Sequence, residues 1–343
     1  MPIFRFDARQ NGVVYDGQDG PLLFLPNNIS TGTVFYLDPV NGSDNNNTGL
    51  SPASAVKTLA EGYGLLREGR NDVLVLIGNG LSSGSARLSA GFTWSKNAAH
   101  LLGVCSSVTV GKRARIAPTA AVAAFANFFT VSGSGCLFKN LQLYHGFATG
   151  IANSICLTVS GGRNLFEDMD IHGMGDTESA ADTGSRSLLV KTTGENTFRR
   201  STIGLDTVIR SVANYTVQFL GTGANSLPRN TFQTCLFPQW SSSAQAAAIY
   251  VLGANPAGID RFQIFDDCIF FNDPNAAGYL ASTGVVRLGA AQNGIILIRH
   301  STCVGFTGWG YNATSRNGIL IDGGAPAGNT TISETGIAVV PTA

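Results

Sequence analysis

Charged side chains are scarce in this sequence. Only 13% of the 343 residues are Asp, Glu, Lys or Arg, and the 22 basic residues balance the 22 acidic ones. A chain with no net charge has no long-range field to attract nucleic acid, anionic lipid or a basic partner, so we expect no nucleic-acid partner. Few charges, 42 glycines and 44% hydrophobic residues are typical of many short strands joined by tight turns, and they disfavour long amphipathic helices.

Long apolar segments are missing as well. None approaches the ~18 residues that span a bilayer, and the longest candidate, VLVLIG at 73–78, has the length of one strand. The first residues, MPIFRFDARQ, contain no basic region followed by an apolar run, which is the pattern of a secretory signal. We therefore expect cytoplasmic synthesis and no membrane insertion.

Short motifs of metal and redox chemistry are also absent. The sequence contains no CxxC, HExxH or DxDxDG pattern, and its four histidines are far apart. We therefore expect no metal and no cofactor. The cysteines are then expected to be free thiols, packed as small apolar side chains. They are Cys105, Cys136, Cys156, Cys235, Cys268 and Cys303.

What the sequence does contain is a repeat. Six-residue units resembling FEDMDI, which begins at Phe166, recur 28 to 34 residues apart. In each unit the first and sixth positions are apolar, whereas the second and third are nearly all polar. The other copies are FKNLQL from Phe138, FRRSTI from Phe198, FQTCLF from Phe232, FDDCIF from Phe265 and, more weakly, IRHSTC from Ile298.

A second strand-like unit precedes each copy and ends at glycine or a small polar residue, as in FFTVSG at 128–133 and LTVSGG at 157–162. One repeat is therefore strand, glycine turn, short strand, polar corner, short strand and variable loop. Stacked repeats of this kind predict an all-β parallel solenoid in which each coil buries its apolar side chains against its neighbours. The expected inward positions are Val131, Val159, Val190, Phe219, Val251 and Leu288 in one strand, and Leu143, Ile171, Ile203, Phe237, Phe270 and Cys303 in another, with Cys235 and Cys268 stacked in the core.

The third position of each unit forms a polar row at one corner. Asn and Asp tolerate the left-handed backbone that a tight bend requires, so the row is expected to mark bends. Its members are Asn140, Asp168, Arg200, Thr234, Asp267 and His300.

The region before the repeats has a different character. A strand and a polar loop precede helix signals at about 54–68, with Ser54 as an N-cap and Gly69 as the end. The string YLDPVNGSDNNNTGLSPASAVKTLAEG resembles the opening of right-handed parallel β-helix proteins of the pectate-lyase-like superfamily. The resemblance implies a right-handed parallel β-helix with an N-terminal capping helix. The expected divisions are an extended arm at 1–33, a first strand, polar loop and capping helix at 34–80, and coils at 81–343.

Two surfaces are candidates for a catalytic site. The resemblance places the acids of polysaccharide lyases on the outer face of the first long sheet, where this chain offers no carboxylate. The residues expected there are Thr130, Thr158, Leu189, Gln218, Tyr250 and Arg287.

Acids do gather at the polar corner. Asp168 and Asp170 could serve as the two carboxyls of a glycosidase, with His172 or Arg200 adjusting their pKa values. The alternative, which we favour, is that Glu167, Asp168 and Asp170 are acids that one turn of the stack exposes to water, with no catalytic role.

Three groups of residues are candidate contact surfaces. Trp309 and Tyr311 lie in a loop that could bind glycan. An apolar spot on an outward row could receive another protein or a loop of the same chain. It comprises Leu236, Ile269 and the neighbouring Trp240. The arm carries apolar anchors for a partner, namely Phe4, Phe6, Leu22, Leu23, Phe24 and Leu25.

The superfamily that the sequence resembles includes lyases, glycosidases, adhesins and virion proteins of tailed bacteriophages, so the fold does not determine the function. The leading hypothesis is a non-enzymatic virion protein, either a capsid decoration or a spike. It would bind capsid or tail proteins through residues 1–33, and the resemblance implies a homotrimer located in the virion. The alternatives are a tailspike-type depolymerase acting on host surface glycan and a glycan-binding adhesin.

Overall fold

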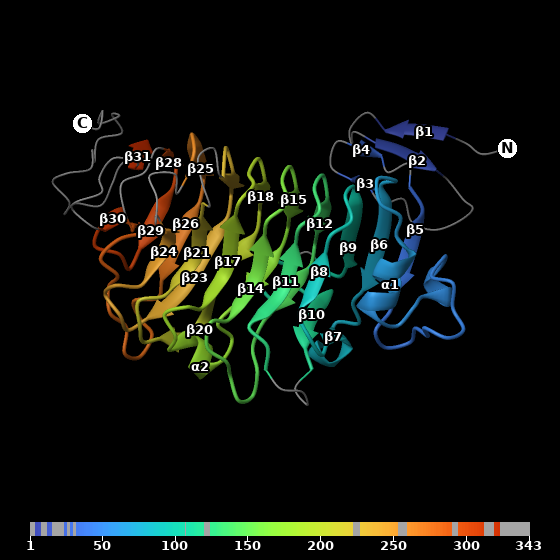
Figure 1. The fold of residues 1–343 in the computed structure, drawn as a ribbon, viewed down its shortest axis with the longest axis horizontal. Coiled ribbons are helices and arrows are strands. Elements are labelled where there is room, and N and C mark those ends of the chain that lie inside the picture. The colour runs from blue at the N-terminus through green and yellow to red at the C-terminus, as the bar shows by residue number, and fades with distance from the viewer. Residues whose placement is uncertain are drawn as a thin grey trace.

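The chain winds into a rod of three parallel β-sheets (Figure 1). The computed structural model describes residues 32–106, 108–119, 124–221, 227–252, 259–289, 294–311 and 319–322, together with four short strands before residue 32. The side chains of those four strands, of residue 311 and of residues 320–322 are outside the described part. Among the residues described, no helix has the length and apolar character needed to cross a membrane.

From β6 to β30 each coil contributes one strand to each sheet, except that one coil contributes both β19 and β20 to the second sheet. Sheet I contains β5 (Val34–Leu37), β6 (Asp72–Ile77), β9 (Ala99–Val104), β12 (Leu137–Lys139), β15 (Leu165–Glu167), β18 (Thr197–Arg199), β22 (Thr231–Gln233), β25 (Phe262–Asp266), β28 (Ile295–Arg299) and β31 (Ile319–Asp322). Sheet II contains β7 (Ala86–Leu88), β10 (Arg115–Pro118), β13 (Gln142–Tyr144), β16 (Asp170–His172), β19 (Thr202–Ile203), β20 (Leu205–Arg210), β23 (Leu236–Ser241), β26 (Ile269–Asn272) and β29 (Thr302–Val304). Sheet III contains β8 (Phe92–Trp94), β11 (Asn127–Val131), β14 (Ile155–Val159), β17 (Arg186–Lys191), β21 (Tyr215–Leu220), β24 (Ala247–Leu252), β27 (Val286–Leu288) and β30 (Gly310–Tyr311).

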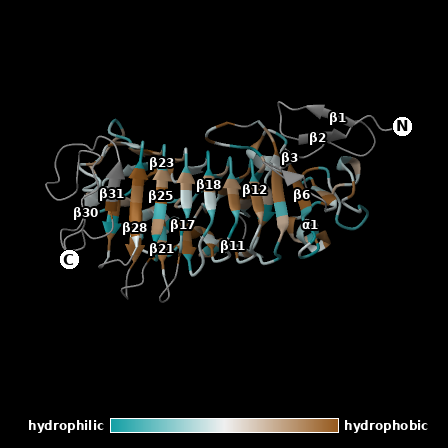
Figure 2. Cartoon of the chain, turned by 90° about the horizontal axis from the view of Figure 1, so that it is seen from above, coloured by the Kyte–Doolittle hydropathy of each residue, from teal (hydrophilic) through white to brown (hydrophobic). Residues whose placement is uncertain are grey.

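The repeat read from the sequence is the repeat of the coils. The phenylalanines that begin successive units pair in register in sheet I, and their rings stack nearly parallel with centroids 4.5 to 5.0 Å apart. The predicted inward rows of sheets II and III are buried, apart from Cys303, which packs half-buried against the core. Cys235 and Cys268 are buried free thiols, as predicted. Viewed from above, hydrophobic segments run along strands such as β28 (Figure 2).

The bend between sheets I and II follows the polar row. All six predicted corner residues have left-handed backbones, with φ from 47° at His300 to 55° at Asn140. Asn and Asp adopt this conformation at lower cost than other residues with a Cβ atom. Arg200 and Thr234 adopt it without that advantage, so the stack, and not the individual residue, determines the bend.

The bend between sheets III and I contains a ladder that was not predicted. Buried amide side chains each accept a hydrogen bond from the backbone N–H group of the preceding coil, at 2.8 to 3.2 Å. The ladder satisfies backbone groups that the bend would otherwise leave buried without a partner. Its members are Asn164, Asn196, Asn230 and Gln263.

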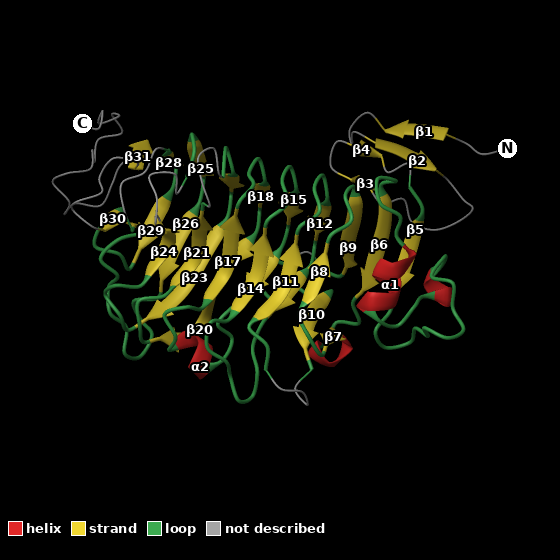
Figure 3. Ribbon diagram, in the orientation of Figure 1, coloured by secondary structure: helices red, strands yellow, loops and turns green. Residues whose placement is uncertain are grey.

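The predicted helix is shorter and begins later. A 3₁₀ turn at Pro52–Ser54 is followed by α1 (Leu59–Leu65), whose N-cap is Thr58 instead of Ser54. Val56 bridges to Leu37 and is fully buried, so the chain must stay extended between the two turns. Helix α1 lies at the N-terminal end of the rod (Figure 3) and contributes Leu59 to the core.

Two further helical turns and two strand pairs complete the described structure. The turns are a 3₁₀ turn at Ser82–Gly84 and α2 (Thr177–Ala180), the latter in a region where no helix was predicted. The arm was expected to be extended, but β1 (Phe4–Asp7) pairs with β2 (Gly12–Tyr15), and β3 (Phe24–Leu25) with β4 (Asn28–Ile29), both antiparallel. The anchor side chains Phe4, Phe6, Phe24 and Leu25, and residues Leu22 and Leu23, lie outside the described part.

Candidate functional site

Glu167 is the innermost acid of the polar corner. Its side chain is fully buried and is bound by Lys139 Nζ at 2.9 Å, by Arg200 Nη2 at 2.7 Å and by Arg199. Burial alone would raise the pKa of Glu167, but hydrogen bonds from Lys139 and Arg199 outweigh it and hold the pKa below its usual value. Glu167 is therefore a buried anion with three cationic partners.

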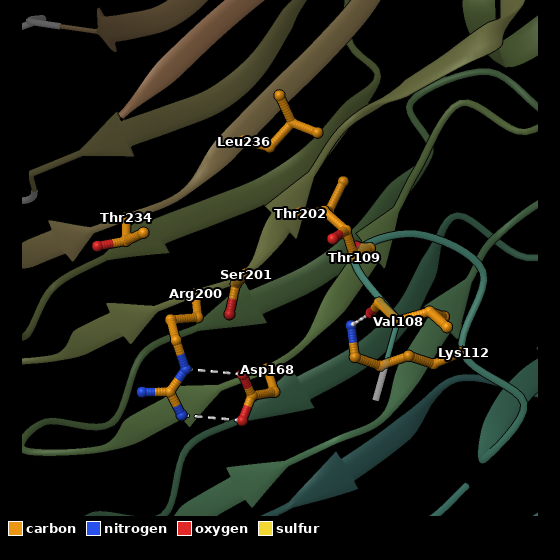
Figure 4. Close-up of a pocket in the computed structure, with 9 residues that line it drawn as sticks. All are labelled: Val108, Thr109, Lys112, Asp168, Arg200, Ser201, Thr202, Thr234 and Leu236. Carbon is orange, nitrogen blue, oxygen red and sulfur yellow. Dashed lines mark hydrogen bonds and ion pairs between the residues drawn. The ribbon is translucent and has the colours of Figure 1, made fainter. Parts of the chain in front are cut away.

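Asp168 occupies the left-handed corner position next to it. Both of its carboxylate oxygens accept hydrogen bonds from Arg200, from Nε and Nη2, each at 3.0 Å (Figure 4). This forked arrangement is the strong geometry for an Arg–carboxylate pair. It fixes the orientation of both side chains at the rim of a pocket.

Asp170 lies on the outer face of β16, yet it is fully buried. It accepts a hydrogen bond from Lys112 Nζ at 2.9 Å and another from the Lys112 backbone N–H at 2.9 Å, and Lys112 is only 2% exposed. The expectation that Glu167 and Asp170 face water is therefore wrong. A loop from an earlier coil covers this part of sheet II.

We call residues 108–114 the crossing loop. It replaces the two-residue corner of other coils between β9 and β10, and it runs over the outer face of sheet II. Beyond its contact with Asp170, it accepts a hydrogen bond at the Thr109 carbonyl from Thr202 Oγ1, at 2.6 Å. Lys112 Nζ also donates to the Val108 carbonyl at 2.6 Å, which closes the loop on itself.

A cavity of about 270 Å³ opens between the crossing loop and the polar corners; we call it the corner pocket. Val108 and Leu236 give it an apolar side, and the paired Asp168 and Arg200 lie at its edge (Figure 4). Hydroxyl groups and Lys112 complete the lining, which comprises Val108, Thr109, Lys112, Asp168, Arg200, Ser201, Thr202, Thr234 and Leu236. This volume is slightly below the range of drug-sized ligand pockets, which begins at about 300 Å³, so the pocket suits one sugar ring better than a longer segment.

The corner pocket is poorly equipped for glycoside hydrolysis. That reaction needs one protonated carboxyl with a raised pKa and a second, ionised carboxylate across the sugar. Asp168 is held by Arg200, and Asp170 is held by Lys112 beneath the crossing loop. His172 is buried and bonded to Gln142 at 3.0 Å, and burial lowers its pKa to about 4. None of these groups is placed to donate or accept a proton at a bound sugar.

The outer face of sheet III has the predicted row in register, and that row contains no carboxylate. Tyr215 and Tyr250 stack there with ring centroids 4.1 Å apart. Arg287 donates to the Tyr215 hydroxyl at 2.6 Å, and Arg186 Nε donates to Gln218 Oε1 at 2.6 Å. These contacts pair Arg287 and Gln218 of the row with Tyr215 and Arg186 of neighbouring positions.

The predicted glycan-binding aromatics are not available as a pair. Trp309 is only 3% exposed and packs against Phe270 in the core, so its assignment to a binding loop is wrong. The indole ring lies in the core, with its centroid 6.0 Å from that of Phe270. The side chain of Tyr311 is outside the described part.

The predicted apolar spot lies on the outer face of sheet II beyond the crossing loop. Leu236 pairs in register with Ile269, which is 49% exposed, and Val304 in the next strand is 39% exposed. Trp240 is half-buried and donates from Nε1 to the Ala277 carbonyl at 3.0 Å. Within the described residues, no group of three or more His, Cys, Asp or Glu side chains is placed to hold a metal ion.

Comparison with known proteins identifies the fold. No family model matches the sequence, and no curated protein matches it. Solved structures do match. A pectin methylesterase from Aspergillus niger is 12% identical with a TM-score of 0.55, covering 91% of this chain and 92% of its own. The pectate lyase Pel9A is 15% identical with a TM-score of 0.54, covering 86% and 69%. A rhamnogalacturonan lyase is 16% identical with a TM-score of 0.53, covering 85% and 73%.

The chain has a right-handed parallel β-helix fold. This confirms the fold that the sequence predicted. At these identities the likeness concerns the fold alone, and function has to be argued from the site.

Proposed function

We propose that this protein is a polysaccharide-binding β-helix that holds a sugar residue in the corner pocket without cleaving the chain. The observation that carries the proposal is that the carboxylates of Glu167, Asp168 and Asp170 are each paired with cations of the same chain. A site built this way lacks the free acid and base of a glycosidase.

The pocket lining supports sugar binding in its own right. A pyranose ring presents hydroxyl groups on its edge and C–H groups on its faces. The Asp168–Arg200 pair and the hydroxyls of Thr202 and Thr234 suit the edge, and Val108 with Leu236 suits a face. Several solved structures with this fold bear names that refer to pectin, pectate or rhamnogalacturonan, which makes polysaccharide the first ligand class to test.

Binding is tested on a glycan array, followed by titration calorimetry with the best-retained oligosaccharide. Asp168→Asn and Leu236→Ala are each expected to weaken binding about tenfold, since each removes one side of the pocket. Asp267→Asn and Ile269→Ala are the matched controls, because they alter the same corner row and the same outward row outside the pocket lining. If no glycan is retained, or the controls weaken binding equally, the proposal fails.

The depolymerase alternative is separated by measuring turnover. Incubation with host capsule or lipopolysaccharide is expected to release neither reducing ends nor unsaturated uronates. Release that is lost in Asp168→Asn and Asp170→Asn would replace the binding proposal with an enzymatic one.

A second candidate function is a structural subunit of a tailed-phage particle, favoured by the exposed apolar side chains of Ile269 and Val304 on sheet II. In this proposal the protein is a homotrimeric capsid decoration or spike in the virion, bound to capsid or tail proteins through residues 1–33. Deleting residues 2–33 should abolish particle binding while the far-ultraviolet circular dichroism of the solenoid is kept. Ile269→Lys should shift the association state in light scattering. Undiminished particle binding by the truncated protein contradicts the anchoring role.

A further inference from the structure

A second open cavity lies at the bend between sheets III and I, on a different corner of the coil from the corner pocket. Its volume is about 420 Å³. Three arginines from successive stretches of the chain line it, and we call it the arginine groove. Its charged side chains are Arg163, Glu195, Arg229, Asp260 and Arg261.

The backbone of this bend points the charged side chains outward. Arg163, Glu195 and Arg229 are each two residues before a strand of sheet I and each has a left-handed φ, between 50° and 62°. Because coils stack at the interstrand spacing, Arg163 and Arg229 are separated by two spacings, roughly 10 Å. Arg261 extends the row toward the C-terminus.

The carboxylate of Glu195 uses only part of the hydrogen-bonding capacity of this row of arginines. Glu195 accepts a hydrogen bond from Arg163 Nε at 2.9 Å on one oxygen and from Arg229 Nη2 on the other. The bond from Arg229 is the main cause that holds the pKa of Glu195 below its usual value. Each guanidinium carries five N–H donors, so one bond apiece leaves most of the fork available. The side chains of Arg163 and Arg229 are 79% and 41% exposed.

The remaining lining fits a sugar more closely than a bare anion. Thr192, Thr193 and Ser134 bring hydroxyl groups to the groove, and Pro228 gives it an apolar surface. The Ser134 hydroxyl oxygen accepts from the Gly162 N–H at 3.1 Å, which leaves its own hydrogen free to donate. With three arginines against Glu195 and Asp260, the lining carries one excess positive charge.

We infer that the arginine groove binds an acidic oligosaccharide along the axis of the rod, with uronate carboxylates on Arg163 and Arg229. The forked guanidinium matches a carboxylate in geometry as well as charge. Glu195 acts as an internal competitor, because it fills part of the space and charge that the ligand's carboxylates require. The inference rests on the proposed polysaccharide function only in its ligand class, since the two cavities share no residue.

The test is titration calorimetry with hexagalacturonate, using maltohexaose as the neutral probe and hexametaphosphate as the charge-only probe. The wild-type protein should bind hexagalacturonate and not maltohexaose in this groove. Arg163→Gln with Arg229→Gln should weaken binding about tenfold or more. Lys57→Gln with Arg70→Gln, which removes the same charge from exposed positions elsewhere, should leave it unchanged.

The Glu195→Gln variant is the decisive test, because the expected change in affinity is opposite in direction to the change that a damaged fold would cause. Removing the competing carboxylate should strengthen hexagalacturonate binding about threefold, whereas damage to the fold would weaken it. Weaker binding in Glu195→Gln, or equal binding in the double arginine variant, overturns the inference. Equally tight binding of hexametaphosphate overturns the saccharide assignment. If Asp168→Asn abolishes hexagalacturonate binding while the arginine variant keeps it, the acidic ligand occupies the corner pocket, so this inference fails and the proposed function stands.

Discussion

Lys112 Nζ lies 2.9 Å from Asp170 Oδ1, and both side chains are closed off from water although 58 residues separate them. The pair joins the crossing loop to β16, with β13 lying between β10 and β16 in the sheet. It holds the crossing loop against the outer face of sheet II, and Lys112 also lines the corner pocket.

Lys112→Met should destabilise the protein strongly. It leaves Asp170 as a buried charge without its cation, which costs about 3–5 kcal/mol of unfolding free energy. Lys112→Met combined with Asp170→Asn should recover part of that loss, because the unpaired charge is then gone. Urea unfolding measures both. Lys139→Met is the control, since it removes one of three cations around Glu167 and should cost clearly less. Equal midpoints for Lys112→Met and wild type would contradict this account.

Asn196→Ala should cost about 3 kcal/mol of unfolding free energy. Its side chain accepts from the Asn164 N–H and donates to the Gly161 carbonyl and to Asn230, all in the interior. Deleting it leaves at least two buried polar groups without partners, each costing about 1–3 kcal/mol. Asn275→Ala, at an exposed turn, should change the unfolding midpoint little. If Asn196→Ala also changes the unfolding midpoint only slightly, water must replace the hydrogen bonds that the Asn196 side chain makes in the amide ladder.

Acidification should weaken the fold between about pH 6.5 and pH 4. Burial lowers the pKa of His100, His145 and His172 to about 4, from an ordinary value of 6.5. In that window the unfolded state binds more protons than the folded state, so stability falls as the pH falls. Each histidine contributes a loss on the order of 3 kcal/mol by pH 4. The pKa of Asp72, lowered to about 2, adds its loss only below pH 4.

The measurement is the unfolding midpoint as a function of pH. His172→Gln should flatten the slope between pH 6.5 and pH 4 while leaving the slope below pH 4 in place. A wild-type midpoint that does not change between pH 7 and pH 4.5 would refute the role of the buried histidines.

Thiol reactivity should divide the cysteines into two groups. Cys136, Cys156, Cys235 and Cys268 are buried, and Cys105 and Cys303 are half-buried. Burial raises the pKa of Cys303 to about 11, which leaves little of the reactive thiolate at pH 8. Native protein should therefore react with a disulfide reagent chiefly at Cys105, and all six thiols should react only after unfolding in denaturant. Mass spectrometry of the labelled peptides assigns the sites. Rapid native labelling of Cys235 or Cys268 would contradict the stacked-core arrangement.

Residues whose environment repeats from coil to coil were predictable from the sequence. Phe166 and Ile171 recur in kind at fixed positions, so their inward orientation follows from spacing alone. The corner conformation of Asp168 followed in the same way. The amide ladder also has a sequence signal, because asparagine stands two residues before phenylalanine in GRNLF, GENTF and PRNTF.

Features that occur once were not predictable. The sequence around Lys112 does not indicate a contact with Asp170. The crossing loop passes over strands of other coils, and its path over them has no repeated sequence signal. Glu167 and Asp170 were therefore assigned to water. The burial of Trp309 was not predictable for a related reason, since the sequence of a loop does not show whether an aromatic side chain faces solvent or packs in the core.

The stack of phenylalanine rings in sheet I makes the rod modular along its length. Each interior ring has an equivalent ring above it and below it, so removing or duplicating one whole coil presents every remaining ring with the same neighbours. The crossing loop interrupts that freedom between β10 and β19, where a duplicated coil would carry Asp170 and Thr202 out of reach of Lys112 and Thr109. The segment under the crossing loop therefore has a fixed number of coils, and so does the stretch from β21 to β27, where Arg287 reaches Tyr215 past the intervening β24.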